Sequence, residues 1–255
     1  MITWLRKTLA RDCEVPTLVH VTHAKAGSTW IDAVLREVFH DHVARRGRHV
    51  ARDTGGDLAS HYFEPGRIYP AMFMTREQFM DHPELHDVKR FIIIRDLRDT
   101  LVSLYFSLKN SQPLKSQSKT LELREKLSVI NREDGLLYLL EVQLPGAAAV
   151  QSSWLNHDEI VLRYEDLIEN AGHLLSETLI EDLEMPVSES AVARAVRRAG
   201  FKQRPGKEDI QSHGGLSMPG DWKNHFSETL RKAFAEKWGQ LLIDTGYESD
   251  LAWAQ

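Results

Sequence analysis

The sequence predicts an α/β protein in which a central, mostly parallel sheet is flanked by layers of helices. Three apolar runs, at residues 17–23, 91–94 and 159–163, are nearly continuous rather than alternating, which is typical of strands buried on both faces. Segments with apolar residues at helical spacing separate these runs, as a three-layer arrangement requires. A length of 255 residues suits one compact domain, so we expect a single domain over residues 1–255.

The first half of the chain alternates strand and helix. The run at 17–23 predicts the first strand, and apolar residues at helical spacing predict a helix over 30–46. The turn-rich stretch 48–66 is interpreted as an exposed loop. A second strand is expected over 67–74, although the proline inside it is unfavourable in a sheet. A threonine followed by acidic and amide residues predicts a helix start over 75–80.

The second half contains the clearest strand pattern, at 91–94. The other predicted elements are a helix at 99–111, two helices within 118–155 that divide near Pro145 and Gly146, a strand at 159–163, helices at 171–184 and 188–199, a loop at 200–222 and a helix at 227–245. A loop as long as 200–222 within a compact domain is more often a binding segment than a plain connection.

Composition narrows the classes of function. A formal net charge of −5 argues against a nucleic-acid partner and against an anionic membrane surface. One cysteine, Cys13, allows neither an internal disulfide nor a cysteine-based metal cluster, so a reducing, cytoplasmic location is expected. No apolar run approaches membrane-spanning length, and the N-terminal residues lack the unbroken apolar core of a signal peptide. We therefore expect no integral membrane segment.

Three candidate site residues directly follow the three clearest strands. Lys25 comes after the first strand, Arg95 after the strand at 91–94, and Tyr164 after the strand at 159–163. Ligands of parallel α/β sheets bind beyond the carboxyl ends of the strands. The sequence therefore predicts that these side chains share one edge of the sheet.

The stretch around Lys25, VHVTHAKAGSTW at residues 19–30, joins a strand, a short loop and a helix start. Amide N–H groups at a helix start have no intrahelical acceptor, and the helix dipole adds about half a positive charge there. With the charge of Lys25, the loop predicts a phosphate site. The lysine precedes the glycine, which departs from the GxxxxGK[ST] pattern of nucleotide triphosphate loops. The alternative is a tight turn with a solvated lysine.

A second anion-binding signal is the pair Arg95 and Ser103, which lie eight residues apart across a strand end and the following helix. Arginine supplies bidentate donor geometry and serine a hydroxyl donor, so both can face one anion. The alternative is that Ser103 is a small buried residue and that Arg98 and Asp99 form a surface ion pair.

Two further stretches are LRYEDL at 162–167, which ends a strand with an aromatic and two acids, and GDWKNHF at 220–226, which precedes the last helix. The first also fits a strand that runs into the acidic start of a helix. In the second, Trp222 has the alternative role of anchoring the preceding loop to the core. Neither stretch identifies a chemistry by itself.

Together, THAKAGSTW, RDLRDTLVSLYF, RYEDL and GDWKNHF resemble in order and spacing the motifs of the sulfotransferases that use 3′-phosphoadenosine 5′-phosphosulfate (PAPS). The likeness is to the bacterial-type, cytosolic sulfotransferase-like members and spans most of the chain. It implies a P-loop-like fold and in-line transfer of a sulfuryl group from PAPS to a hydroxyl or amine. The product would be 3′-phosphoadenosine 5′-phosphate (PAP), and no metal is expected.

The resemblance also implies roles for individual residues. Lys25 would act on the 5′-phosphosulfate as a catalytic residue, and Arg95 and Ser103 would hold the 3′-phosphate. The other donor-binding residues that it implies are the loop and helix-start residues Ala26, Gly27, Ser28 and Thr29, and the aromatic residues Trp30, Tyr164, Phe201 and Trp222.

The chain departs from the family pattern at two places. Gly215, Leu216 and Ser217 stand where the family usually carries Arg-Lys-Gly, so two charge-assisted contacts to the 3′-phosphate are missing. Arg204 and Lys207 are the candidates to replace them.

The second departure concerns the general base. Many members carry a histidine about twenty residues before the equivalent of Arg95, whereas this region reads RIYPAMFMT. We interpret His61 as the substitute base, with Asp57 and Glu64 as alternatives. His61 can equally be a solvated loop residue.

Two other functions stay open from the sequence. A nucleotide-dependent kinase would use the same strand, loop and helix for ATP, but it calls for Mg²⁺ and a lysine directly before serine or threonine. A non-catalytic nucleotide-binding module would explain the missing cations. The acceptor of the sulfuryl group is expected to be a small molecule, a lipid or a sugar, and self-association of the chain is left open.

Overall fold

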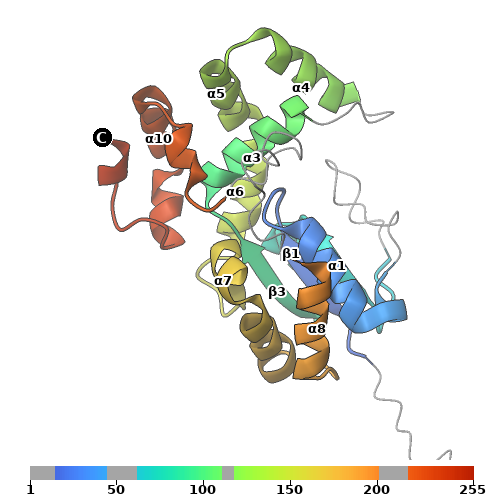
Figure 1. Ribbon diagram of the computed structural model, residues 1–255. Helices are drawn as coiled ribbons and strands as arrows, with labels where there is room; N and C mark the ends of the chain where they lie inside the picture. The colour runs from blue at the N-terminus through green and yellow to red at the C-terminus, as the bar shows by residue number, and fades with distance from the viewer. Residues whose placement is uncertain (1–14, 45–61, 111–117, 201–217) are drawn as a thin grey trace, which may run out of the picture.

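The computed structural model describes residues 15–44, 62–110, 118–200 and 218–255 (Figure 1). At its centre is a sheet with the strand order β2-β1-β3-β4, in which each neighbouring pair is parallel. The strands are β1 (Leu18–Thr22), β2 (Ile68–Met72), β3 (Lys89–Ile94) and β4 (Val161–Arg163). The predicted α/β architecture and its four strands are therefore confirmed.

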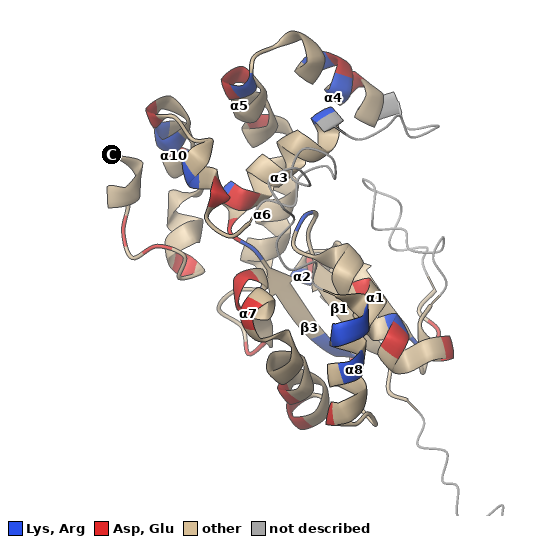
Figure 2. Cartoon of the chain, viewed as in Figure 1, with Lys and Arg blue, Asp and Glu red and all other residues tan. Residues whose placement is uncertain are grey.

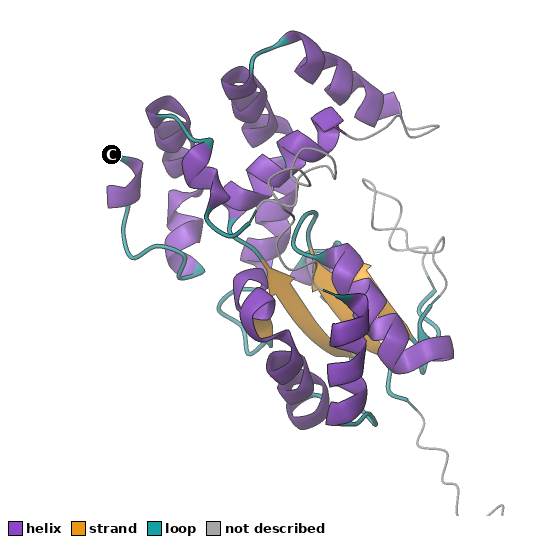
Figure 3. Ribbon diagram, viewed as in Figure 1, coloured by secondary structure: helices purple, strands orange, loops and turns teal. Residues whose placement is uncertain are grey.

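Helices make up most of the rest of the described chain (Figure 3). They are α1 (Ser28–Phe39), α2 (Arg76–Met80), α3 (Leu97–Asn110), α4 (Ser118–Val129), α5 (Arg132–Val142), α6 (Leu144–Ser153), α7 (Tyr164–Ser176), α8 (Glu189–Ala199) and α10 (Glu228–Asp244). Shorter helical turns are η1 (His40–His42), η3 (Glu177–Asp182), η4 (Asp221–Asn224) and η5 (Ala252–Ala254).

The two faces of the sheet bury separate apolar clusters, as expected for a three-layer fold. One face, with Leu18 of β1 and Phe91 of β3, packs on α1, α7 and α8. The other face, with Val19 and Ile92, packs on Phe79 of α2 and on Trp154, which follows α6. A third cluster joins α3, α5, α6 and α10, which gather beyond one end of the sheet (Figure 1).

The register brings the carboxyl ends of three strands to one edge. Thr22 of β1 lies opposite Ile93 of β3, and Ile94 lies opposite Arg163 of β4. The loop after β1, the start of α3 and the start of α7 therefore all begin at this edge, as predicted from the sequence.

Strand β2 tolerates a proline because it lies at the edge of the sheet and is bulged. The pairing with β1 slips between Val19 and Val21, opposite Pro70 and Ala71. Ala71 has a left-handed φ of 59°, and its N–H donates to Nδ1 of the buried His20, 2.9 Å away. A side chain thus replaces the ladder bond that the bulge removes.

Some helix boundaries differ from those predicted. Residues 118–155 form three helices rather than two, because Asn131 caps α5 by accepting the N–H of Asp134 at 2.9 Å. The division predicted near Pro145 is present between α5 and α6, and Pro145 stands in the first turn of α6, where its missing N–H is not needed. Helix α7 begins at Tyr164, directly after β4, and not at 171 as predicted.

Among the described residues, no helix has both the length and the apolar character needed to cross a bilayer. Within the same residues, no group of three metal-ligating side chains is arranged to hold a metal ion.

Candidate active site

The loop between β1 and α1 turns sharply through two left-handed residues. Lys25 has φ 71°, and Gly27, the residue that caps α1, has φ 81°. The helix starts at Ser28, and the N–H groups of Trp30 and Ile31 both donate to the Gly27 carbonyl oxygen, at 2.9 and 3.1 Å. The first turn of α1 therefore lies at the carboxyl edge of the sheet, and a helix start in such a place favours an anion.

The other loop residues differ in exposure. Ala26 is fully buried, Ser28 and Trp30 are half-buried, and Thr29 is exposed at the start of α1. Ala26 can therefore bind a ligand only through its backbone, whereas the side chains of Ser28 and Thr29 are accessible to a ligand at the helix start.

Lys25 is held by a residue that the sequence did not single out. Its Nζ donates to Oγ of Ser107 on α3, at 2.5 Å. Ser107 lies one helical turn beyond Ser103, so both hydroxyl groups are on the same face of α3. Burial, aided by the positive charge of Arg95, lowers the pKa of Lys25 to about 8. The half-buried Lys25 side chain is therefore partly desolvated, beside Ser107 and Arg95.

Arg95 connects β3 to this loop. The residue is 1% exposed, and its Nη1 donates to the Lys25 carbonyl oxygen at 2.7 Å. Its guanidinium group also lies over the ring of Tyr164, 4.5 Å from the ring centroid. Two cationic residues, one in the loop after β1 and one at the end of β3, therefore lie side by side at the carboxyl edge (Figure 2).

Tyr164 packs against the glycine of the loop as well as against Arg95. A Cβ added to Gly27 would lie 2.9 Å from two carbons of the Tyr164 ring, so glycine is required here for close packing as well as for its φ. Burial raises the pKa of the Tyr164 hydroxyl, so the phenol is neutral at physiological pH. The structure thus brings Lys25, Arg95 and Tyr164 together, as their strand-end positions predicted, and Gly27 packs against the same tyrosine ring.

Glu165, one of the two acids of the RYEDL stretch, has a structural role that the sequence did not reveal. Glu165 accepts the N–H of Asp96 at 3.1 Å and the hydroxyl of Tyr247 at 2.7 Å. Burial raises the pKa of Glu165. This carboxylate therefore ties the start of α7 to the residue that follows Arg95 and to the segment after α10.

The GDWKNHF stretch is fastened to α3 by Asp99. This carboxylate accepts the N–H of Gly220 at 2.7 Å and that of Trp222 at 2.9 Å, and burial raises its pKa to about 6. Trp222 is buried beneath Arg98, whose guanidinium group lies 3.9 Å from the ring centroid. This packing fits the alternative in which Trp222 anchors the segment on the core.

The suggested surface ion pair between Arg98 and Asp99 is wrong. Arg98 is 2% exposed and pairs with Asp96 and with Glu248, at 2.7 and 2.5 Å. Asp99 instead accepts the backbone N–H groups of the GDW turn. The reason is helical geometry, because adjacent residues on a helix point in different directions. Ser103 is 2% exposed, as both of its interpretations allow.

The candidate bases are placed unequally. Glu64 is exposed and pairs with Arg67 at 3.2 Å. It precedes β2, and in a parallel sheet this puts it toward the amino edge, away from Lys25. His61 and Asp57 lie outside the described residues, as do Phe201, Arg204, Lys207 and the segment 215–217.

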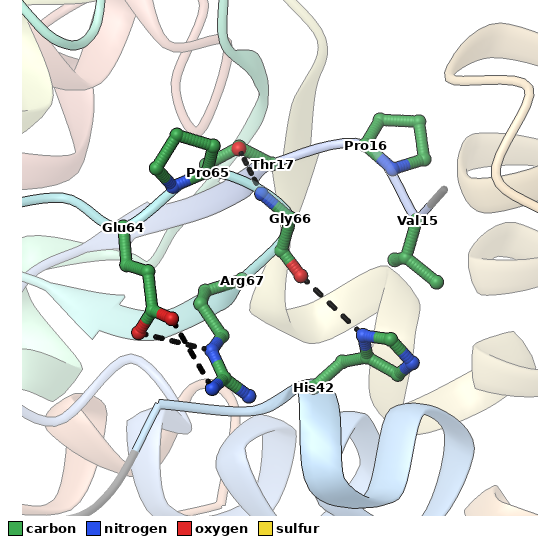
Figure 4. A pocket seen from close by; sticks show the side chains of 8 residues that line it. All are labelled: Val15, Pro16, Thr17, His42, Glu64, Pro65, Gly66 and Arg67. Carbon is green, nitrogen blue, oxygen red and sulfur yellow. Dashed lines mark hydrogen bonds and ion pairs between the residues drawn. The ribbon is translucent and has the colours of Figure 1, made fainter.

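A pocket of about 630 Å³ also lies at the amino edge of the sheet (Figure 4). Thr17 and Arg67, which line it, directly precede β1 and β2. Its polar groups already bond to one another, because Thr17 accepts the N–H of Gly66 and Glu64 pairs with Arg67. Because it lies at the amino edge and Lys25 follows the carboxyl end of β1, this pocket is separate from the cluster around Lys25.

Comparison with known proteins agrees with this geometry. The family model described as a sulfotransferase domain matches residues 16–246. The crystal structure of a mouse sulfotransferase, SULT7A1, complexed with PAP shares the fold, with a TM-score of 0.61 and 17% sequence identity. That match covers 89% of this chain and 84% of that chain. No curated protein sequence matches. Because the family model covers most of its length, this chain belongs to the sulfotransferase family.

Proposed function

We propose that this chain transfers a sulfuryl group from PAPS to a hydroxyl or amine of an acceptor, with Lys25 at the reacting end of the donor. The observation that carries the proposal is the placement of the half-buried Lys25 just before the start of α1, beside Arg95. A helix start and a partly desolvated cation together favour an anion such as a phosphosulfate. Sulfotransferase family membership supplies the reaction class.

The chemical step is an in-line displacement at sulfur. The acceptor oxygen or nitrogen forms a bond to sulfur while the bond from sulfur to the bridging oxygen breaks, and PAP leaves. Negative charge develops on that bridging oxygen, where the Lys25 ammonium group and the amides of Gly27 and Ser28 stabilise it. Because these groups are fixed before the reaction, little reorganisation is needed.

The 3′-phosphate is assigned to Arg95 and Ser103. Both are buried, Arg95 directly after β3 and Ser103 in the second turn of α3, and Arg95 already bonds to the loop that holds Lys25. The Arg95 guanidinium group thus supports the loop assigned to the 5′-phosphosulfate and also attracts the 3′-phosphate. Trp30 and Phe201 remain the residues proposed to pack beside the adenine, and Tyr164 the residue proposed at its edge.

The acceptor proton is assigned to His61, with Asp57 as the alternative. Glu64 is the weakest of the three because its carboxylate pairs with Arg67 near the amino edge of the sheet. Comparing pH–rate profiles of His61→Ala and the parent tests this assignment, and an unchanged rate and profile would transfer the role to Asp57. The acceptor itself is proposed to be a small molecule, a lipid or a sugar.

Calorimetry with PAP and turnover of labelled PAPS, each with and without Mg²⁺, test the proposed function. We expect metal-independent PAP binding and turnover in the parent, whereas Lys25→Met should lose at least about a hundredfold in kcat/KM, in line with the loss of one oxyanion donor. Lys89→Met is the matched control because Lys89 starts β3 at the opposite edge. Mg²⁺-dependent use of ATP would support the kinase alternative, and PAP binding without turnover would support the non-catalytic module.

A further inference from the structure

A buried polar bridge lies beneath the Lys25 loop, and none of the sequence motifs includes both of its members. His23 follows β1 directly and is 1% exposed, and Gln151 lies on α6 and is fully buried. Gln151 is the only polar residue among the five buried residues of α6. A polar side chain in this position costs free energy unless its hydrogen bonds are made.

The bridge joins the two strand ends that carry the site. His23 Nε2 lies 3.0 Å from Oε1 of Gln151, and the Arg95 N–H donates to the same oxygen at 3.4 Å. Arg95 in turn donates to the Lys25 carbonyl oxygen at 2.7 Å. Because His23 and Lys25 are two residues apart, these bonds close a ring through β1, α6, β3 and the loop.

The chemistry of the amide oxygen determines which nitrogen of His23 carries the proton. With Oε1 of Gln151 accepting the Arg95 N–H, the atom that faces His23 is an acceptor, so Nε2 of His23 is the donor. Burial lowers the pKa of His23 to about 4, so the ring is neutral at physiological pH. The other ring nitrogen, Nδ1, faces the Ala24 carbonyl oxygen at 3.0 Å and can donate to it only when the ring takes up a second proton.

We propose that Gln151 and His23 are positioning residues. They hold the Lys25 loop and Arg95 at the spacing required by the 5′ and 3′ ends of PAPS. The inference rests on the proposed function, in which Lys25 and Arg95 bind opposite ends of one molecule. Neither residue is suited to contact the molecule that accepts the sulfuryl group, because both side chains are buried and both ring nitrogens of His23 face protein oxygens. Reaction rates depend steeply on such spacing.

Substitutions of Gln151 test the proposal with two readouts: the PAP dissociation constant and the amide hydrogen exchange of Arg95 followed by NMR. Gln151→Met keeps a similar volume and removes the acceptor oxygen. We expect at least a tenfold weaker affinity for PAP and at least a tenfold faster exchange of the Arg95 amide. Gln151→Glu keeps acceptor oxygens and should remain within about threefold of the parent in affinity.

The control is Val150→Ala, which shortens a neighbouring buried side chain of α6 outside the bridge. Equal PAP affinity and equal Arg95 exchange in Gln151→Met and Val150→Ala would overturn the proposal. If Gln151→Met does not fold, His23→Phe removes the donor and keeps the ring volume, and it should give the same two losses.

The parent protein provides a test that does not depend on activity. The ¹⁵N chemical shifts of the His23 ring should show a neutral ring protonated at Nε2, and a ring protonated at Nδ1 alone would contradict the bond from Nε2 to the Gln151 oxygen. If the parent fails to bind PAP, the proposed function fails, and the ring shifts and the Arg95 exchange still test the bridge.

Discussion

Replacing Gly27 with alanine should damage the Lys25 loop through two separate effects. The φ of 81° is left-handed and costs a residue with a Cβ about 1–2 kcal/mol. The new Cβ would also lie 2.9 Å from two carbons of the Tyr164 ring, and such overpacking costs about 1–3 kcal/mol. The ring cannot easily withdraw because it is buried against Arg95. Together, these effects should lower the free energy of unfolding by about 2–5 kcal/mol.

Two other glycines separate these effects in urea denaturation. Gly220 also has φ 81°, but nothing lies within 4 Å of a Cβ added there, so Gly220→Ala should lose only about 1–2 kcal/mol. Gly146 is helical and equally open, so Gly146→Ala should be neutral or stabilising by up to about 1 kcal/mol. Equal losses in Gly27→Ala and Gly220→Ala would refute the role assigned to the contact with Tyr164.

A double-mutant cycle measures that contact directly. In a Tyr164→Ala background the overlap is gone, so Gly27→Ala should cost only the backbone term, and the coupling free energy should be about 1–3 kcal/mol. Calorimetry with PAP should show that Gly27→Ala weakens binding at least tenfold, because the displaced loop carries Lys25. A cycle that gives no coupling would mean that the ring moves away freely.

Further predictions concern Lys25, Ser107 and Asp99. The affinity for PAP should fall as the pH rises above about 8, where Lys25 loses its proton in the folded state. The contribution of Lys25 to the free energy of unfolding should rise over the same range, because the unfolded state keeps the proton to higher pH. Calorimetry and urea denaturation at several pH values check both signs, with Lys25→Met as the control. Ser107→Ala should lower the affinity for PAP about three- to tenfold without a loss of fold, and affinity equal to the parent's would show that the serine does not orient the ammonium group. Asp99→Ala should lower the free energy of unfolding at pH 7 by about 2–4 kcal/mol, because the part-buried N–H of Gly220 and the buried N–H of Trp222 lose their acceptor. In the parent, the contribution of Asp99 to the free energy of unfolding should decline as the pH rises from about 4 to 6, because burial raises the pKa of Asp99 in the folded state. Asp99→Asn should abolish this pH dependence.

Elements with a strong local signal were predicted well. The apolar runs at 18–22 and 91–94 are strands, and the capping residues Thr75, Ser188 and Ser227 each accept an N–H from the first turn of a helix. Within residues 118–155, the division near Pro145 was predicted, whereas the additional division at Asn131 was not. Asparagine is favoured at a helix N-cap but also in turns, so its residue type alone does not locate a helix start.

The candidate site shows the same division. The strand-end positions of Lys25, Arg95 and Tyr164 were enough to predict that they meet, because parallel strands in register bring their carboxyl ends to one edge. The partners of these residues were not predictable. Lys25 bonds to Ser107 across 82 residues, and His23 reaches Gln151 across 128 residues. A serine or a glutamine on a helix carries no local signal for such a contact.

The sequence by itself therefore determined the fold class, the turn from strand to helix at Lys25 and the edge of the sheet at which Lys25, Arg95 and Tyr164 meet. These depend on periodicity, on turn residues and on the order of strands, all of which are short-range properties of the chain. Only the tertiary structure decided that Arg95 supports the Lys25 loop, that Asp99 holds the GDW turn, and that Trp222 packs in the core. Those roles arise from burial, because a charged or polar group removed from water bonds to whichever partner the packed helices bring within reach.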